Sequence, residues 1–141
     1  MTRNIHRIAI AVAGVFAIVF GLGTIASGGN ALFGGAEARA AAGNAVGFVL
    51  WFNFLAGFAY VAAGIGLLLQ RRWAARLAVV IAAATLAVFA AFGVHVALGG
   101  PYEMRTVAAM VLRSVVWVAI AAMVWRSVEC PVCRNTPAQP L

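Results

Sequence analysis

The chain has 141 residues, of which 65% are hydrophobic and only 9% are charged. A soluble domain is about half apolar and about a quarter charged. A soluble core built from this chain could not hide so much apolar surface, and the mean hydropathy of +1.03 agrees with this. The composition therefore excludes an ordinary soluble protein and indicates an integral membrane protein.

Four apolar runs are each long enough to cross a bilayer, which takes about 20 apolar residues. They cover residues 8–26, 45–69, 77–98 and 107–125. Strands are disfavoured because the runs lack the alternating pattern of a barrel wall, and every backbone group in lipid must be paired within its own element. The sequence predicts an all-α, integral membrane four-helix bundle over residues 1–128 with short connections, followed by a cytoplasmic tail at residues 129–141.

The arginines predict how the helices are oriented. All ten basic residues are arginines, and most lie before the first run, between the second and third, or after the fourth: Arg3, Arg7, Arg71, Arg72, Arg76, Arg126 and Arg134. In the two other loops, Arg39 and Arg105 are each balanced by a glutamate. The positive-inside rule then predicts cytoplasmic termini in a multi-pass protein of a bacterial inner membrane. This topology explains the net charge of +7, so no nucleic-acid partner is expected.

The first run has two interpretations. Its basic start and apolar stretch resemble a secretory signal peptide, with ARA at residues 38–40 as the cleavage site. The run is longer than a typical signal, and its small residues are typical of packed transmembrane helices, so we expect a retained span. One helical face carries a seam of small residues that can serve the bundle or a partner subunit, and a second small pair lies beside it: Gly14, Ala17, Gly21 and Thr24, then Gly23 and Ser27.

Polar residues inside the second and fourth runs form a predicted intramembrane site. Asn53 and Tyr60 share one stripe of the second run, while Arg113 and Trp117 share one stripe of the fourth. At about 1.5 Å per residue, Asn53 and Arg113 both lie about 12 Å below the outer surface. An arginine near the membrane centre costs at least about 2.5 to 3.5 kcal/mol on insertion scales, and it usually faces the bundle interior.

The partner of Arg113 is left open by the sequence. The three acidic residues are all glutamates and lie outside the four runs. Glu37 or Glu103 can fold inward, backbone carbonyls with Asn53 can accept the hydrogen bonds, or an anionic group of a lipid, quinone or neighbouring subunit can enter. Arg113 is then either functional or a structural residue that holds the bundle together.

A second cluster of chemistry-bearing residues is predicted at the outer face. The stretch HVALGGPYEMR brings His95 within one short loop of Glu103, Met104 and Arg105. A histidine beside a carboxylate can relay protons, and histidine with methionine can bind copper or act as a haem axial pair. A haem held by two histidines of one chain is excluded, because His6 lies at the opposite membrane face. The alternative is an ordinary interface histidine.

The tail carries the two cysteines, Cys130 and Cys133, as a single CxxC. Thiols in a reducing cytoplasm can present two soft ligands to zinc, copper or mercury. One CxxC is half of a zinc site, so closure needs a homodimer or another partner. The alternatives are inert or oxidisable thiols and redox exchange, although no βαβ context for a thioredoxin-like role surrounds the motif.

Motifs of soluble enzymes do not occur in the sequence: there is no phosphate-binding glycine motif, no paired carboxylates and no serine, histidine and aspartate set. The stretch AYVAAGIGLLLQRRWAARLAVVIAAATLAVFAAFGVHVALGG, residues 59–100, resembles the middle of the DoxX-like small four-helix membrane proteins. Trp51 and Asn53 stand where that group has an acidic residue. The resemblance implies an accessory or redox-associated inner-membrane protein, in some members linked to quinol oxidation.

Three functions follow as hypotheses. The first is a non-catalytic accessory or assembly subunit of a membrane redox system of the quinol oxidase type, within a larger membrane complex. The second is a protein that transports or handles copper or mercury through Cys130 and Cys133, with His95 and Met104. The third is a redox protein that binds quinone or haem through Arg113 and its neighbours.

Overall fold

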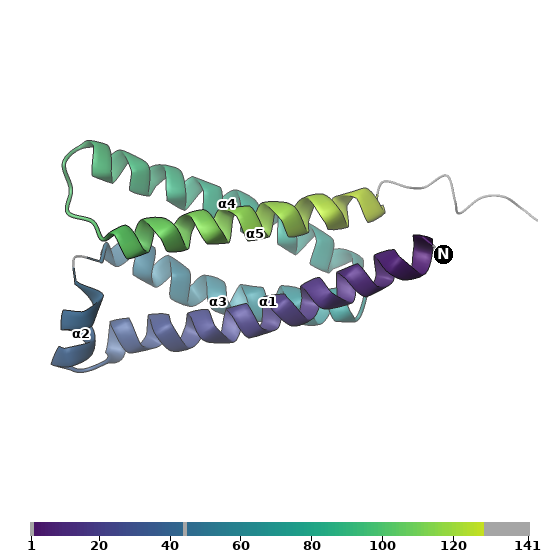
Figure 1. The fold of residues 1–141 in the computed structure, drawn as a ribbon, viewed down its shortest axis with the longest axis horizontal. Coiled ribbons are helices and arrows are strands. Elements are labelled where there is room, and N and C mark those ends of the chain that lie inside the picture. The colour runs from purple at the N-terminus through teal and green to yellow at the C-terminus, as the bar shows by residue number, and fades with distance from the viewer. Residues whose placement is uncertain (1, 44, 129–141) are drawn as a thin grey trace, which may run out of the picture.

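The computed structural model describes residues 2–43 and 45–128. These residues form five helices and no strand: α1 (Thr2–Phe33), α2 (Ala36–Ala42), α3 (Gly47–Leu68), α4 (Arg72–Ala97) and α5 (Met104–Val128) (Figure 1). All except α2 contain a stretch long and apolar enough to cross a membrane. The prediction of an all-helical fold with four helices apolar enough to span a membrane is confirmed, whereas membrane insertion and the cytoplasmic location of the termini stay predictions.

The helices extend beyond the apolar runs. The first helix continues to Phe33, past the expected end at residue 26, because its last turns pack on α3, with Gly28 and Phe33 both against Phe54. At about 1.5 Å per residue, the 32 residues of α1 measure about 48 Å, more than the hydrocarbon thickness of about 30 Å. The following stretch was expected to be a loop, but its alanine-rich sequence forms α2, because alanine is the best helix former.

The four long helices alternate in direction (Figure 1). Helix α1 lies along α3, α3 lies along α4, and α4 lies along α5. The start of α1, the α3–α4 turn and the end of α5 lie at one end of the bundle, while α2 and the α4–α5 loop lie at the other. We call these the terminal end and the α2 end.

Glycines allow α1 and α3 to touch through their backbones. A Cβ atom on Gly14 would lie 2.9 Å from the carbonyl oxygen of Gly64, and one on Gly21 would lie 2.8 Å from that of Gly57. Small residues permit such contact where lipid provides no hydrophobic drive for helix association. Gly23, which belongs to the second predicted small pair, has nothing within 4 Å of its Cβ position, so only the first seam packs within the bundle.

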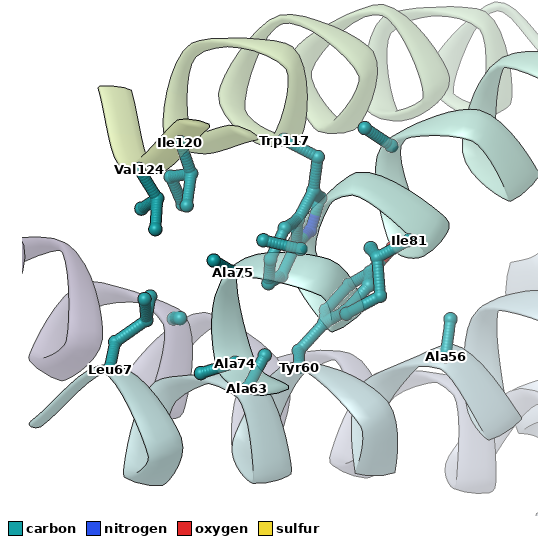
Figure 2. Close-up of a cluster of buried hydrophobic side chains, with 13 residues drawn as sticks. Ala56, Tyr60, Ala63, Leu67, Ala74, Ala75, Ile81, Trp117, Ile120 and Val124 are labelled. Atoms are coloured by element: carbon teal, nitrogen blue, oxygen red, sulfur yellow. The ribbon is translucent and has the colours of Figure 1, made fainter. Parts of the chain in front are cut away.

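The core lies where α3, α4 and α5 meet, toward the terminal end. Figure 2 shows the large side chains of Tyr60, Leu67, Ile81 and Trp117 filling the space between small residues of the neighbouring helices. The alanines of this cluster let the helices approach closely: Ala56, Ala63, Ala74, Ala75, Ala78 and Ala82. Close packing at this end contrasts with the α2 end, where the helices enclose a cavity.

Candidate functional site

A cavity of about 530 Å³ lies at the α2 end, between α1, α3 and α5, with α2 along its side. Its walls follow one face of each of these three helices: Thr24, Ser27, Gly28, Asn30 and Ala31 of α1, Val49, Leu50 and Asn53 of α3 with Val46 just before it, and Thr106, Ala109 and Arg113 of α5. Most of these side chains are small, as are the alanines of α2 that line it. The cavity exists because small residues of three helices meet at the same depth, and its volume falls in the range typical of small-molecule sites, about 300 to 1,000 Å³.

Arg113 lies at the inner end of the α5 stripe and is only 9% exposed. Its guanidinium forms no hydrogen bond and no ion pair with any residue that the structure describes, and its Nε is fully buried. The contact that the structure gives it is the ring of Phe20, whose centroid lies 6.0 Å from Cζ. A guanidinium carries five donors, so this group has hydrogen bonds to give into the cavity.

Asn53 lies on the opposite wall of the same cavity. Its Oδ1 is buried and has no hydrogen-bond partner in the described part of the chain. The structure therefore brings Asn53 and Arg113 together, and both line the cavity as two of the four predicted intramembrane residues. Buried polar groups are almost always hydrogen-bonded in native proteins, so two such groups facing one cavity point to a ligand.

Tyr60 and Trp117 lie below the cavity, in the core. Their ring centroids are 4.7 Å apart, and Phe20 stacks on Tyr60 at 5.9 Å. Both are fully buried, and Tyr60 Oη and Trp117 Nε1 have no hydrogen-bond partner among the described residues. Thr85 of α4, with a buried hydroxyl, lies near the Tyr60 hydroxyl. These two predicted site residues thus belong to the packed core next to the cavity, and they do not line the cavity itself.

The four residues of the predicted outer-face site do not gather at one point. Glu103 and Arg105 line the cavity at its α2 end, and the carboxylate of Glu103 lies against Gly43. His95 instead faces its own loop, where Nε2 lies 3.3 Å from the carbonyl oxygen of Pro101 and can donate to it. Met104 is 68% exposed. Consecutive residues at the start of a helix point about 100° apart, which separates Met104 from its neighbours.

The described residues contain no group of three or more histidine, cysteine, aspartate or glutamate side chains that could hold a metal ion. The predicted metal ligands Cys130 and Cys133 lie outside the described residues. The structure therefore describes the cavity with Arg113, whereas the binding of a soft metal by the two cysteines of the tail stays a prediction.

Sequence reasoning places Thr106 and Met110 on the stripe of Arg113, but it did not identify Thr106, Phe20, Thr24 or Ser27 as part of this site. Thr24, Ser27 and Thr106 line the cavity, and Phe20 provides the ring beneath the guanidinium. The hydroxyl residues carried a usable signal, because polar side chains are rare within membrane spans. Phe20 carried none, since the sequence contains nine phenylalanines with no pattern that separates one from the rest.

Comparisons with protein-family models, with curated proteins and with solved structures find no match for this chain. The function is therefore argued from the geometry of the cavity and the sequence pattern.

Proposed function

We propose that this chain is a non-catalytic accessory subunit of a redox system in a bacterial inner membrane, and that it acts by holding the polar head of a lipid-soluble molecule. The observation that carries the proposal is the cavity between α1, α3 and α5, with the buried guanidinium of Arg113 and the amide of Asn53 in its walls. Pockets with mostly apolar walls and few convergent polar groups are typical ligand sites.

The redox context comes from the resemblance of residues 59–100 to DoxX-like proteins. A quinone of such a system is one molecule of the right kind, because its carbonyl oxygens accept hydrogen bonds from Arg113 and the Asn53 amide. A non-catalytic role is favoured because the described residues of the cavity walls include one carboxylate, Glu103 at the rim, and no histidine. General acid–base work usually needs such a group within hydrogen-bond reach of the reacting atom.

The proposal is tested in membranes from cells that lack the protein. Quinol-dependent oxygen uptake should fall, and wild-type protein supplied on a plasmid should restore it. A variant with the cavity filled, Ala109→Phe, should fold and reach the membrane but fail to restore uptake. Leu112→Phe is the matched control, because Leu112 is exposed on the outer face of the same helix. Equal restoration by both variants would refute a role for the cavity.

A further inference from the structure

The charge on Arg113 decides what kind of head the cavity accepts. A guanidinium stays protonated in proteins, and this one lies within the fourth candidate span. Among the described residues that line the cavity, Glu103 carries the one carboxylate, and it lies near the α2 end, about 15 Å from Arg113 along the chain. Glu37 is exposed on α2, and the carboxylate of Glu103 lies against Gly43.

The other groups around the guanidinium are neutral. Phe20 offers the face of its ring at 6.0 Å, and a ring attracts a cation far less than a carboxylate does. Thr24 and Ser27 bring hydroxyls to the cavity wall, and Asn53 brings an amide. The hydroxyl of Ser27 already donates to the backbone carbonyl of Thr24, whereas the hydroxyl of Thr24 and the amide of Asn53 are groups that can donate to an acceptor in the cavity. Since Oδ1 and Nδ2 of an amide are exchanged by a simple rotation, Asn53 can present its donor as well.

The rim carries one charge of each sign. Arg105 and Glu103 both line the cavity near its α2 end, and Arg105 lies about 12 Å from Arg113 along α5. Between the two arginines the walls are small or apolar, including Val46, Val49 and Leu50. The cavity thus combines the inner charge of Arg113 and neighbouring hydrogen-bond donors with an apolar strip on α3 and small alanines, and this combination matches an acyl chain that ends in an oxyanion.

We propose that the occupant is an amphiphile whose head is a negatively charged oxyanion, a carboxylate or a phosphate, bound by Arg113. This inference rests on the proposed function, in which the cavity holds a lipid-soluble molecule, and it names the chemistry of the head. A neutral quinone carbonyl accepts the same hydrogen bonds but leaves the buried charge uncompensated. Charge-assisted hydrogen bonds are roughly twice as strong as neutral ones, so the anion binds more tightly.

Native mass spectrometry of the full chain, released from a neutral detergent, tests the inference with probes that share one tail. Decanoate and decyl phosphate carry the anionic heads, decanol is neutral, decyltrimethylammonium is cationic, and decylubiquinone is a neutral quinone. We expect one molecule of an anionic probe per chain, bound at least about tenfold more tightly than decanol. Tighter binding of decanoate would identify the natural ligand as a fatty acid, and tighter binding of decyl phosphate would identify it as a phospholipid.

Two variants separate charge from shape. Arg113→Gln keeps a hydrogen-bond donor and removes the charge, so the preference for anions should disappear. Arg113→Lys keeps the charge and should retain most of the preference. Arg76→Gln is the matched control, because Arg76 is an exposed arginine of α4 that does not line the cavity, and it should leave the preference for anions unchanged. The wild-type probe series alone decides the question if an Arg113 variant does not fold.

Binding of decanol or decylubiquinone as tight as that of both anions would overturn the inference, as would an unchanged preference in Arg113→Gln. In that case decylubiquinone bound in the cavity would leave the proposed function standing. If no probe binds, the ligand-holding function itself fails together with the inference.

Discussion

Replacing Gly21 by alanine tests whether backbone contact between α1 and α3 stabilises the bundle. The added Cβ atom would lie 2.8 Å from the carbonyl oxygen of Gly57, 2.9 Å from Cγ2 of Val61 and 3.0 Å from Cβ of Tyr60. Ordinary van der Waals contact begins at 3.4 Å, so the carbonyl is too close by about 0.6 Å. The oxygen belongs to the backbone of α3 and cannot rotate away, so the helices must separate.

The size of the effect follows from this forced separation. Inserting a methyl group into a packed interface costs about 1 to 3 kcal/mol when the backbone must shift. The Tyr60 ring, which stacks on Trp117, would move with α3, so we expect the upper half of that range. A loss of this size lowers a thermal midpoint by roughly 5 to 10 °C for a chain of this length.

Gly23→Ala is the matched control, because it lies on the same helix and has nothing within 4 Å of its Cβ position. Alanine favours a helix over glycine by up to about 1 kcal/mol, so this variant should be unchanged or slightly more stable. Thermal unfolding of both variants in the same detergent, followed by helical circular dichroism, gives the comparison. A Gly21→Ala midpoint equal to or above that of Gly23→Ala would show that the close approach does not stabilise the bundle.

Two further outcomes are expected. Gln70 at the end of α3 has a φ of 52°, and Gly99 at the end of α4 has a φ of 81°; this left-handed backbone costs other residues about 1 to 2 kcal/mol. Gln70→Gly should therefore raise the unfolding midpoint and Gly99→Ala should lower it, and the same sign for both would contradict the assignment of these turns. For topology, an impermeant thiol reagent should label Ala36→Cys from the periplasm in cells but leave Cys133 unlabelled until the membrane is broken. Labelling of Cys133 in intact cells would reverse the predicted orientation.

The apolar helices could be predicted from composition because crossing a bilayer imposes one requirement, about 20 apolar residues in a row. Their ends could not be predicted as well, since these depend on tertiary contacts. Phe33 continues α1 because its ring meets Trp51 and Phe54 across the helix interface. The short helix α2 was missed because seven residues carry no periodic signal that separates a helix from a loop.

The interior position of Arg113 could be predicted from its own helix, because the same helical face carries Met110 and Trp117. The structure buries all three side chains. The shared depth of Arg113 and Asn53 follows from counting residues. The cavity between them does not, because it depends on how three helices diverge at the α2 end. The arrangement of the outer-face residues could not be predicted for a related reason, since the sequence proximity of His95 to Glu103 does not say which way the imidazole ring or the carboxylate points.

The proposed ligand would link the stability of the bundle to binding. If Arg113 served only to hold the helices together, we would expect it to pair with groups on neighbouring helices, because an unpaired buried charge is strongly destabilising. The described helices instead place donors and an open volume beside that charge, and the close-packed core of α3, α4 and α5 lies toward the terminal end. An occupant that binds the folded chain stabilises it by mass action, about 2.7 kcal/mol at one hundred times its dissociation constant. Under the proposed function, the stability of the bundle would therefore rise with the concentration of the molecule that Arg113 binds, which thermal unfolding with and without the anionic probe would measure.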